Sequence, residues 1–363
     1  MRTLSWGDVA EEDPLLASPA GRTSEAPGRP LRIAVTGASG TVGALVTRML
    51  AGRYAVTAVS RDPARAARGG VAGTIVGADF AERRDLSRAL AGADAVLAVT
   101  FDPLRPTHDA NILAAARREG VRHVVKLSAL AVTDPDAQDV ITRWQRESEE
   151  QLKASGLAWT ILRPRAFMSN TLDWAPSVRG QGVVRGLYGT SRNSCVDPRD
   201  VAEAAACALS MPGHDGRIYA LTGPQALSVR EQTEQLGRAL GRALTYEELT
   251  EEQALQAWRR RHPEPVAQAI LDTARRQRDG AKTLLADGVR EVTGHAPAAF
   301  RTWAERHAGL FRGAGPGGPA RHSACVEAGS VTTPGSRWTG PVQAGRGEYF
   351  ECHGHRGSEK VHY

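Results

Sequence analysis

The stretch that decides the fold is Leu31–Gly43, which reads LRIAVTGASGTVG. A short apolar run ends in three glycines and is followed by an amphipathic segment, Ala44–Leu50. This order predicts a strand, a tight turn and a helix. Such a turn leaves backbone N–H groups at the helix N-terminus, where the macrodipole favours an anion. We expect Gly37 to form the turn, Gly40 to let a pyrophosphate approach and Gly43 to let helix and strand pack closely, which together predict a dinucleotide site.

Composition limits the class of protein. The chain has 363 residues, 41% hydrophobic and 24% charged, which is enough to bury a sizeable core in one or two domains. No apolar run approaches the roughly 20 residues of a membrane span, and acidic residues occupy the place of a secretory apolar core, so we expect a cytoplasmic protein without membrane contact. The net charge is +6, but arginines are scattered and lysine occurs only at positions 126, 153, 282 and 360. Without a basic stripe, we expect no nucleic-acid partner.

The cysteines and histidines predict neither a disulfide framework nor a metal site. The four cysteines lie far apart, at positions 195, 207, 325 and 352. The segment Cys352–His355 lacks the paired spacing of a zinc site.

Apolar runs alternate with helical segments from residue 31 to Pro164. The expected strands are 32–36, 55–60, 73–76, 95–100, 123–128 and 158–162. The expected helices are 41–50, 64–68, 84–91, 109–119 and 141–154. This alternation predicts an α/β fold in which a doubly wound parallel sheet carries helices on both faces.

The rhythm changes after Pro164. A loop-rich stretch to about 197 precedes a helix at 198–209, a strand at 217–221 and helices at 228–240, 251–261, 265–278 and 298–308. We therefore divide the chain into a disordered leader (1–29), a nucleotide-binding domain (30–165), a smaller, mostly helical C-terminal substrate lobe that returns to the core (166–312) and a disordered tail (313–363).

Several motifs in order resemble one known family. They are TGASGTVG at 36–43, GADF at 77–80, VVKLSAL at 124–130, SGLAWTILRPRAFMSN at 155–170, VDPRDVAEAA at 196–205 and YALTGPQALS at 219–228. Across residues 31–312 the chain resembles the NmrA-like, atypical short-chain dehydrogenase/reductase family. The resemblance implies an NAD(P)-binding Rossmann domain with a small substrate lobe, and relatives that are quinone or imine-type reductases or dinucleotide-binding regulators.

The end of the second expected strand favours NADP(H) over NAD(H). An NAD site places a carboxylate there, whereas this chain has Ser60 followed by Arg61, a residue that can pair with a 2′-phosphate. The alternative for Arg61 is a solvated surface side chain, and Asp62 is expected to cap the next helix. The full set of predicted cofactor contacts is Thr36, Gly37, Ser39, Gly40, Thr41, Val42, Gly43, Ser60, Arg61, Asp79, Phe80, Thr100, Phe101 and Lys126.

The predicted chemistry lacks the usual proton donor. Typical short-chain dehydrogenases carry Tyr-x-x-x-Lys on the helix after the fifth strand, and NmrA-like relatives often carry His-x-x-x-Glu. The matching positions here are Gln145 and Glu149, and glutamine cannot titrate. Ser128 and Gln145 are the candidate catalytic residues, with a strand-end hydroxyl and a solvated glutamine as the alternatives. Lys126 has a solvated position as its alternative, and Glu149 is expected to pair with Arg146 or Lys153.

The loop after the sixth strand is expected to wall an apolar substrate pocket with Phe167, Met168, Asn170 and Trp174, unless these side chains only pack between the lobes. The leading hypothesis is an NADPH-dependent oxidoreductase that transfers hydride to a small or medium hydrophobic quinone, carbonyl or imine. One alternative is a non-enzymatic NADP(H) sensor that binds a protein partner. A second is a non-redox isomerase or cyclase. The sequence leaves open whether the chain is a monomer or a homodimer.

Overall fold

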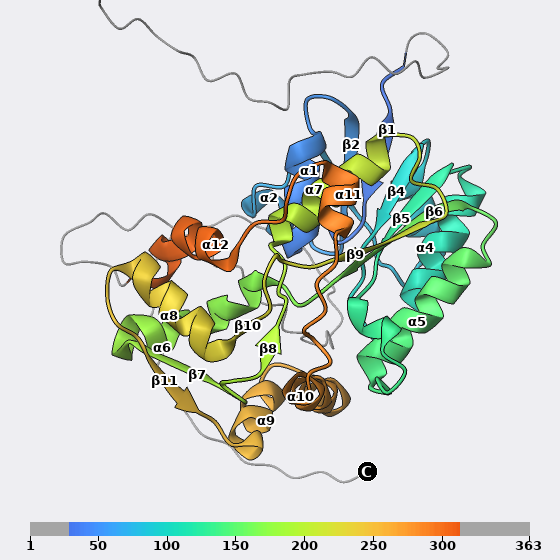
Figure 1. Ribbon diagram of the computed structural model, residues 1–363. Helices are drawn as coiled ribbons and strands as arrows, with labels where there is room; N and C mark the ends of the chain where they lie inside the picture. The colour runs from blue at the N-terminus through green and yellow to red at the C-terminus, as the bar shows by residue number, and fades with distance from the viewer. Residues whose placement is uncertain (1–28, 313–363) are drawn as a thin grey trace, which may run out of the picture. The chain divides into compact units, whose positions relative to one another are not determined.

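The computed structural model describes residues 29–312 (Figure 1). Its centre is a seven-stranded sheet of order β3-β2-β1-β4-β5-β6-β9 in which every neighbouring pair is parallel. The strands, in sheet order, are β3 (Thr74–Gly77), β2 (Ala55–Ser60), β1 (Arg32–Val35), β4 (Ala95–Ala98), β5 (His123–Leu127), β6 (Ala158–Pro164) and β9 (Arg217–Leu221). Residues 1–28 of the expected leader lie outside the described residues. The whole of the expected tail, which contains the Cys352–His355 segment, lies outside them too.

The strand order reverses between β1 and β4. Val35 of β1 is in register with Ala58 of β2 on one side and with Leu97 of β4 on the other. In an open parallel sheet, ligands bind beyond the carboxyl ends of the strands at such a switch point. The glycine turn follows β1 directly, so the predicted dinucleotide site lies at this point.

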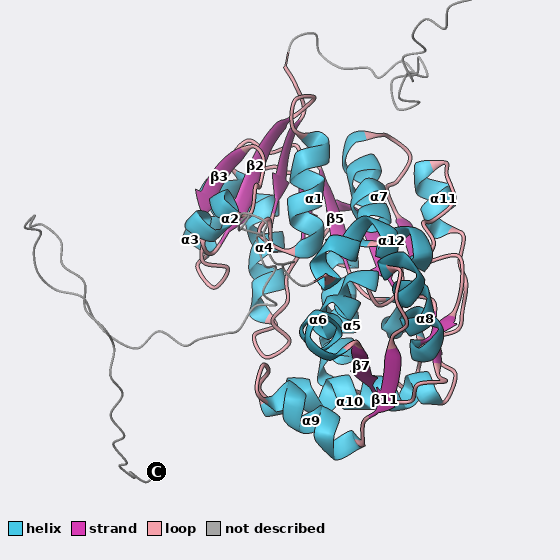
Figure 2. Ribbon diagram, turned by 90° about the vertical axis from the view of Figure 1, so that its left-hand side faces the viewer, coloured by secondary structure: helices cyan, strands magenta, loops and turns pink. Residues whose placement is uncertain are grey.

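Helices cover both faces of the sheet, which confirms the predicted doubly wound fold. Helices α1 (Thr41–Leu50), α7 (Pro198–Ser210) and α11 (Gly288–Thr293) pack with alternate strand residues such as Ile33 and Val35 on one face. Figure 2 shows these three helices side by side. The opposite face, with Ala34 and Val124, is covered by α3 (Arg83–Leu90), α4 (Thr107–Arg118) and α5 (Val140–Lys153). The short α2 (Pro63–Arg68) connects β2 to β3. Helix α5 is preceded by a 3₁₀ turn, η2 (Leu130–Thr133).

The remaining elements gather beyond the carboxyl ends of the strands, and we refer to them as the lobe (Figures 1 and 2). They are η3 (Met168–Trp174), α6 (Ala175–Gln181), β7 (Val183–Gly186), β8 (Arg192–Asn193), β10 (Leu227–Ser228), α8 (Val229–Leu240), β11 (Thr245–Glu248), α9 (Glu251–Arg259), α10 (Glu264–Arg278), α12 (Phe300–His307) and η4 (Ala308–Phe311). Their main apolar core contains Val178, Leu236, Phe300 and Trp303.

The structure corrects the sequence interpretation within the lobe. The stretch expected to be loop-rich to about residue 197 contains η3, α6 and two short strands. Strand β7 pairs in parallel with β11, and β8 pairs antiparallel with β10. These strands are two to four residues long and their partners are distant in sequence, so no local period marks them.

Two further expectations concern cysteines and membrane spans. Cys195 and Cys207 carry free thiols, and Cys207 is half-buried on α7. Within residues 29–312, no helix combines the length and apolar character needed to cross a bilayer.

Candidate functional site

The glycine turn places the N-terminus of α1 at the sheet edge. Gly37 has φ of +60°, and a Cβ atom there would lie 2.8 Å from the carbonyl oxygen of Val99. A Cβ atom at Gly43 would lie 2.4 Å from the carbonyl oxygen of Gly37. Glycine is therefore required at both positions. Gly40 is the N-cap, no side chain caps the helix, and its first turn has no acidic residue. The arrangement offers backbone N–H groups to an anion, which is the chemistry that a diphosphate requires.

The predicted contacts around this turn differ in accessibility. Gly40 and Thr41 are exposed, whereas Val42 points into the core. Thr36 is fully buried, and its hydroxyl accepts a hydrogen bond from the Val99 N–H at 2.8 Å and donates to the Leu97 carbonyl at 3.1 Å. Its side chain therefore joins β1 to β4. Ser39 is half-buried.

An exposed arginine follows the carboxyl end of β2. Ser60 is buried, its hydroxyl lies 3.3 Å from that of Ser39, and Asp62 caps α2 by accepting from the Arg65 N–H at 2.9 Å, as predicted. Arg61 is exposed and forms no ion pair within residues 29–312. Its guanidinium is accessible to a phosphate.

A buried histidine that the sequence interpretation missed lies close enough to feel the charge of Arg61. His108 of α4 is 3% exposed, and its Nε2 has no hydrogen-bond partner among the described residues. Burial lowers the pKa of His108; Asp102 opposes this, and the charges of Arg105 and Arg61 add to it. The ring of Phe80 lies edge-on to it, with centroids 6.2 Å apart. Exposed Asp79 is near enough to act on the same imidazole. Phe80 therefore packs against His108, and the charges of Arg61 and Asp79 act on its imidazole.

A buried ion pair joins the end of β5 to helix α4. Lys126 Nζ lies 2.8 Å from Asp109 Oδ1, and both side chains are 3% exposed. Asp109 also accepts hydrogen bonds from Thr100 Oγ1 and Trp144 Nε1, both at 2.9 Å. Burial acts to raise the pKa of Asp109, but the charge and hydrogen bond of Lys126 outweigh it, so this pKa is lowered. Lys126 is therefore not solvated, and its amine is already bound to Asp109. Phe101 is 60% exposed and lies edge-on to Trp144, with centroids 6.1 Å apart.

Ser128 and Glu149 belong to a second buried network. Ser128 Oγ donates to Glu149 Oε1 at 2.5 Å, and Arg163 of β6 binds both carboxylate oxygens of Glu149, with Nε at 2.9 Å from Oε1. The expected pairing of Glu149 with Arg146 is wrong, because Arg146 donates instead to backbone carbonyls before α5. The contact of Glu149 with Lys153 is long, at 3.9 Å.

Gln145 lies one helical turn before Glu149. It is 6% exposed, and its Oε1 is buried without a hydrogen-bond partner among residues 29–312. The solvated position considered for Gln145 is therefore wrong. Its Oε1 therefore has unused hydrogen-bonding capacity within the described structure.

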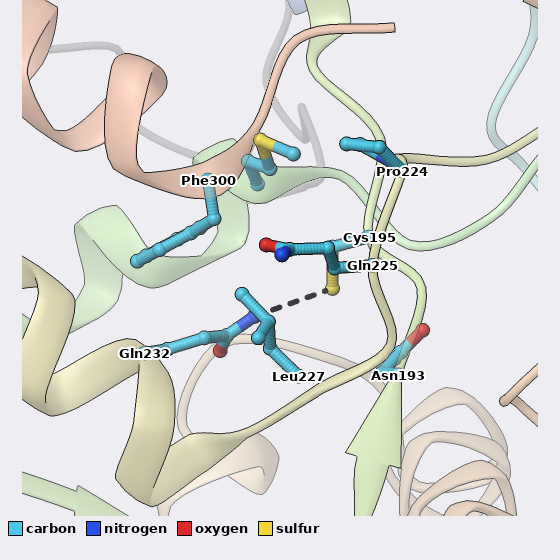
Figure 3. Close-up of a pocket in the computed structure, with 8 residues that line it drawn as sticks. Asn193, Cys195, Pro224, Gln225, Leu227, Gln232 and Phe300 are labelled. Atoms are coloured by element: carbon cyan, nitrogen blue, oxygen red, sulfur yellow. Dashed lines mark hydrogen bonds between the residues drawn. The ribbon is translucent and has the colours of Figure 1, made fainter.

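The four predicted pocket residues do not form one wall. Met168 and Trp174 pack in the lobe core, Phe167 packs against the core of the sheet, and Asn170 is exposed. Figure 3 shows the pocket that Met168 lines together with Cys195, Gln232 and Phe300, where the Gln232 amide donates to Cys195 Sγ at 3.7 Å. Side chains close over this pocket and leave no space for a water molecule. For Met168 and Trp174, packing is the interpretation that the structure supports.

Comparisons with known proteins agree with this geometry. A family model described as NAD(P)H-binding matches residues 37–212. The chain is 50% identical over 279 residues to (4-alkanoyl-5-oxo-2,5-dihydrofuran-3-yl)methyl phosphate reductase of Streptomyces griseus, covering 77% of this chain and 99% of that one. It is 36% identical over 283 residues to the NAD(P)H azoreductase of Xenophilus azovorans, again covering 77% and 99%.

A solved structure with the same fold was determined with a cofactor. It is an NADPH-dependent quinone oxidoreductase of Escherichia coli, complexed with NADPH, with a TM-score of 0.66 and 26% identity. The match covers 76% of this chain and 99% of that one.

Proposed function

The chain belongs to the NAD(P)H-binding, NmrA-like atypical short-chain dehydrogenase/reductase family, and on that basis we propose that it is an NADPH-dependent reductase of an electron-poor alkene in a phosphorylated butenolide. The observation that carries the proposal is the 50% identity to a reductase of that substrate class across nearly the whole of the relative. The uncapped N-terminus of α1 and its two obligatory glycines support binding of the dinucleotide diphosphate.

The chemistry of such an acceptor suits a site without a strong acid. In the ring named for the relative, the C3–C4 double bond is conjugated with both the lactone carbonyl and the alkanoyl carbonyl. A bound reduced nicotinamide would supply the hydride for C3. The π electrons move to C4 and the two carbonyl oxygens, and C4 then takes a proton from water. Because two carbonyls share the negative charge, no titrating side chain is needed at the position of Gln145.

We propose that Gln145 orients the acceptor by donating a hydrogen bond from its side-chain amide to a substrate carbonyl. Ser128 and Glu149 then act as positioning residues, because the hydroxyl hydrogen of Ser128 is bound by Glu149. The Lys126–Asp109 pair likewise holds the end of β5 against α4 beneath the site rather than contacting the cofactor.

Replacing Gln145 with leucine tests this role. We expect kcat/KM for the acceptor to fall about 10-fold, the effect of one neutral hydrogen bond in a closed site, while the Kd of NADPH stays unchanged. Steady-state kinetics and fluorescence titration of NADPH measure the two quantities. Unchanged kinetics would show that the Gln145 amide does not contact the acceptor.

The cofactor preference is assigned to Arg61. We propose that its guanidinium binds the 2′-phosphate of NADP(H), with His108, Asp79 and Phe80 around the adenosine. Arg61→Ala should weaken NADPH binding about 10- to 100-fold, the effect of a charge-assisted hydrogen bond, and leave NADH binding nearly unchanged. The control is Arg68→Ala, which removes an exposed arginine from α2. Equal losses for the two cofactors in Arg61→Ala would exclude this role.

The experiment that tests the function follows NADPH oxidation by the nicotinamide absorbance. The acceptors are a 4-alkanoyl butenolide phosphate, a benzoquinone, an aldehyde and an imine. We expect the highest kcat/KM with the butenolide phosphate, and NADPH deuterated at C4 of the nicotinamide should deliver deuterium to ring C3. A higher kcat/KM with the quinone would favour an activity like that of the azoreductase and quinone relatives. Tight NADPH binding without turnover of any acceptor would favour the sensor.

A further inference from the structure

A cluster of basic side chains lies between the sheet edge and the lobe, apart from the α1 turn. Arg165 is the first residue after β6, Arg276 lies on α10 and Lys282 follows α10. The backbone fixes two of them, since the Arg165 N–H donates to the Leu221 carbonyl at 2.8 Å and the Lys282 carbonyl accepts from the Ser194 N–H at 3.1 Å. Helix α10 packs against α5, the helix that carries Gln145. The cluster therefore adjoins the place proposed for the acceptor.

Two of these three cations are buried and form no ion pair within residues 29–312. Arg165 is 8% exposed and Lys282 is 9% exposed, and neither forms an ion pair within the described part of the chain. The Nε of Arg165 and the Nη1 of Arg276 are buried without a hydrogen-bond partner there. Only Arg276 has a carboxylate partner, because its Nη2 binds Asp134. A buried cation without a partner is costly, and an anionic ligand would offset that cost.

The three charges are close enough to affect one another. Burial lowers the pKa of Lys282 to about 8, and the charges of Arg165 and Arg276 add to this effect. Burial also lowers the pKa of Arg165. Among the nearby acids, Asp134 binds Arg276, and Asp139 caps α5 by accepting from the Thr142 N–H. Cys195 is also nearby, and burial raises the pKa of its thiol, which keeps it neutral.

We propose that Arg165, Arg276 and Lys282 form a subsite that binds the phosphate monoester of the acceptor. A dianion matches two unpaired buried cations, and a guanidinium binds phosphate oxygens in a fixed geometry. The inference rests on the proposed function, because a phosphate on the acceptor is known only from the name of the relative. Beyond the proposed function, the inference identifies the residues of this chain that select the phosphate.

The decisive comparison uses one acceptor with and without its phosphate. Wild type, Arg165→Met and Lys282→Met are assayed with the butenolide phosphate and with the corresponding hydroxymethyl butenolide. We expect each variant to lose about 10- to 100-fold in kcat/KM for the phosphate and little for the alcohol. Arg238→Met, which removes an exposed arginine from α8, should change neither. The inference would be overturned if a variant lost equal kcat/KM for both acceptors, or if wild type had the same kcat/KM for both. Either result would leave the proposed function standing.

A binding measurement separates the two proposals. Methyl phosphate is titrated calorimetrically into the full chain saturated with NADP⁺. We expect wild type to bind it and both variants to bind at least about 10-fold more weakly. If no butenolide is reduced but this pattern appears, the proposed function fails and the phosphate subsite stands. Equal binding by wild type and the variants would reject the subsite. Because Arg165 and Lys282 are unpaired, neither replacement should lower the melting temperature.

The pH dependence provides an independent check. Lys282 is charged below its pKa of about 8 and loses its proton as the pH rises through that value. The phosphate stays dianionic above about pH 7, since its second pKa is about 6. We therefore expect kcat/KM for the phosphate, but not for the alcohol, to fall as pH rises through 8. Lys282→Arg should abolish that fall, and a fall of the same size in this variant would contradict the role of Lys282.

Discussion

Replacing Lys126 with methionine is expected to lower the free energy of unfolding by about 3–5 kcal/mol. The amine of Lys126 lies 2.8 Å from Asp109 in a region where both side chains are 3% exposed. The variant leaves the Asp109 carboxylate buried without its cationic partner, although the Thr100 and Trp144 hydrogen bonds remain. Urea denaturation measures the loss directly.

Two controls distinguish loss of the pair from loss of a lysine. The double variant Lys126→Met/Asp109→Asn removes both charges and keeps an acceptor for Thr100, so it should be more stable than Lys126→Met alone. Lys153→Met removes a partly exposed lysine paired with Glu150 and should change stability by less than about 1 kcal/mol. A double variant no more stable than Lys126→Met would show that the unpaired charge is not what destabilises the single variant.

Replacing Gly43 with valine is expected to reduce NADPH binding by about 100-fold or more. Even a Cβ atom at this position would lie 2.4 Å from the carbonyl oxygen of Gly37. The backbone cannot yield without moving α1 away from the turn, and overpacking of this kind costs about 1–3 kcal/mol or more. The amides that would hold the diphosphate move with the helix. Calorimetric titration with NADPH measures the effect.

A matched glycine makes this test specific. Gly180 lies in α6 with open space around its Cβ position, so Gly180→Ala should retain full NADPH affinity. Circular dichroism of Gly43→Val shows whether the chain still folds. A folded Gly43→Val protein with wild-type affinity would mean that the dinucleotide is not held by this turn.

The architecture could be predicted because its signals are local. Each strand of the sheet that is buried on both faces is a short apolar run, and each helix between strands has its own amphipathic period. The observed ends of two elements differ from the predicted ends where the chain leaves the sheet. The strand expected at 95–100 ends at Ala98, and the helix expected from Asp109 begins at Thr107. There Thr100 binds Asp109 instead of continuing the ladder.

The pairing of charges could not be predicted, because it depends on neighbours that the sheet brings together. Helical spacing favoured Arg146 as the partner of Glu149, but β6 places Arg163 opposite the carboxylate. The pocket residues were grouped by proximity in sequence. In the structure, Phe167 precedes η3 and packs against the core of the sheet. Met168, the first residue of η3, packs in the core of the lobe instead.

The rarity of lysine in the sequence is a signal for one member of the basic cluster, Lys282. The chain prefers arginine so strongly that lysine occurs at only four positions. Lys126 and Lys282, two of the four, are buried in the structure. Lysine thus occupies two buried positions in a chain that uses arginine for most of its basic residues.

The position of β9 limits how the molecule can be divided. The chain leaves the sheet after Pro164, passes through η3 to α7 and returns as β9, which pairs with β6 from Thr160 to Pro164. A fragment cut at residue 165 would keep the glycine turn but expose one side of β6 as an unpaired edge. Such edges are templates for strand addition between molecules, so the nucleotide-binding half would aggregate when produced separately.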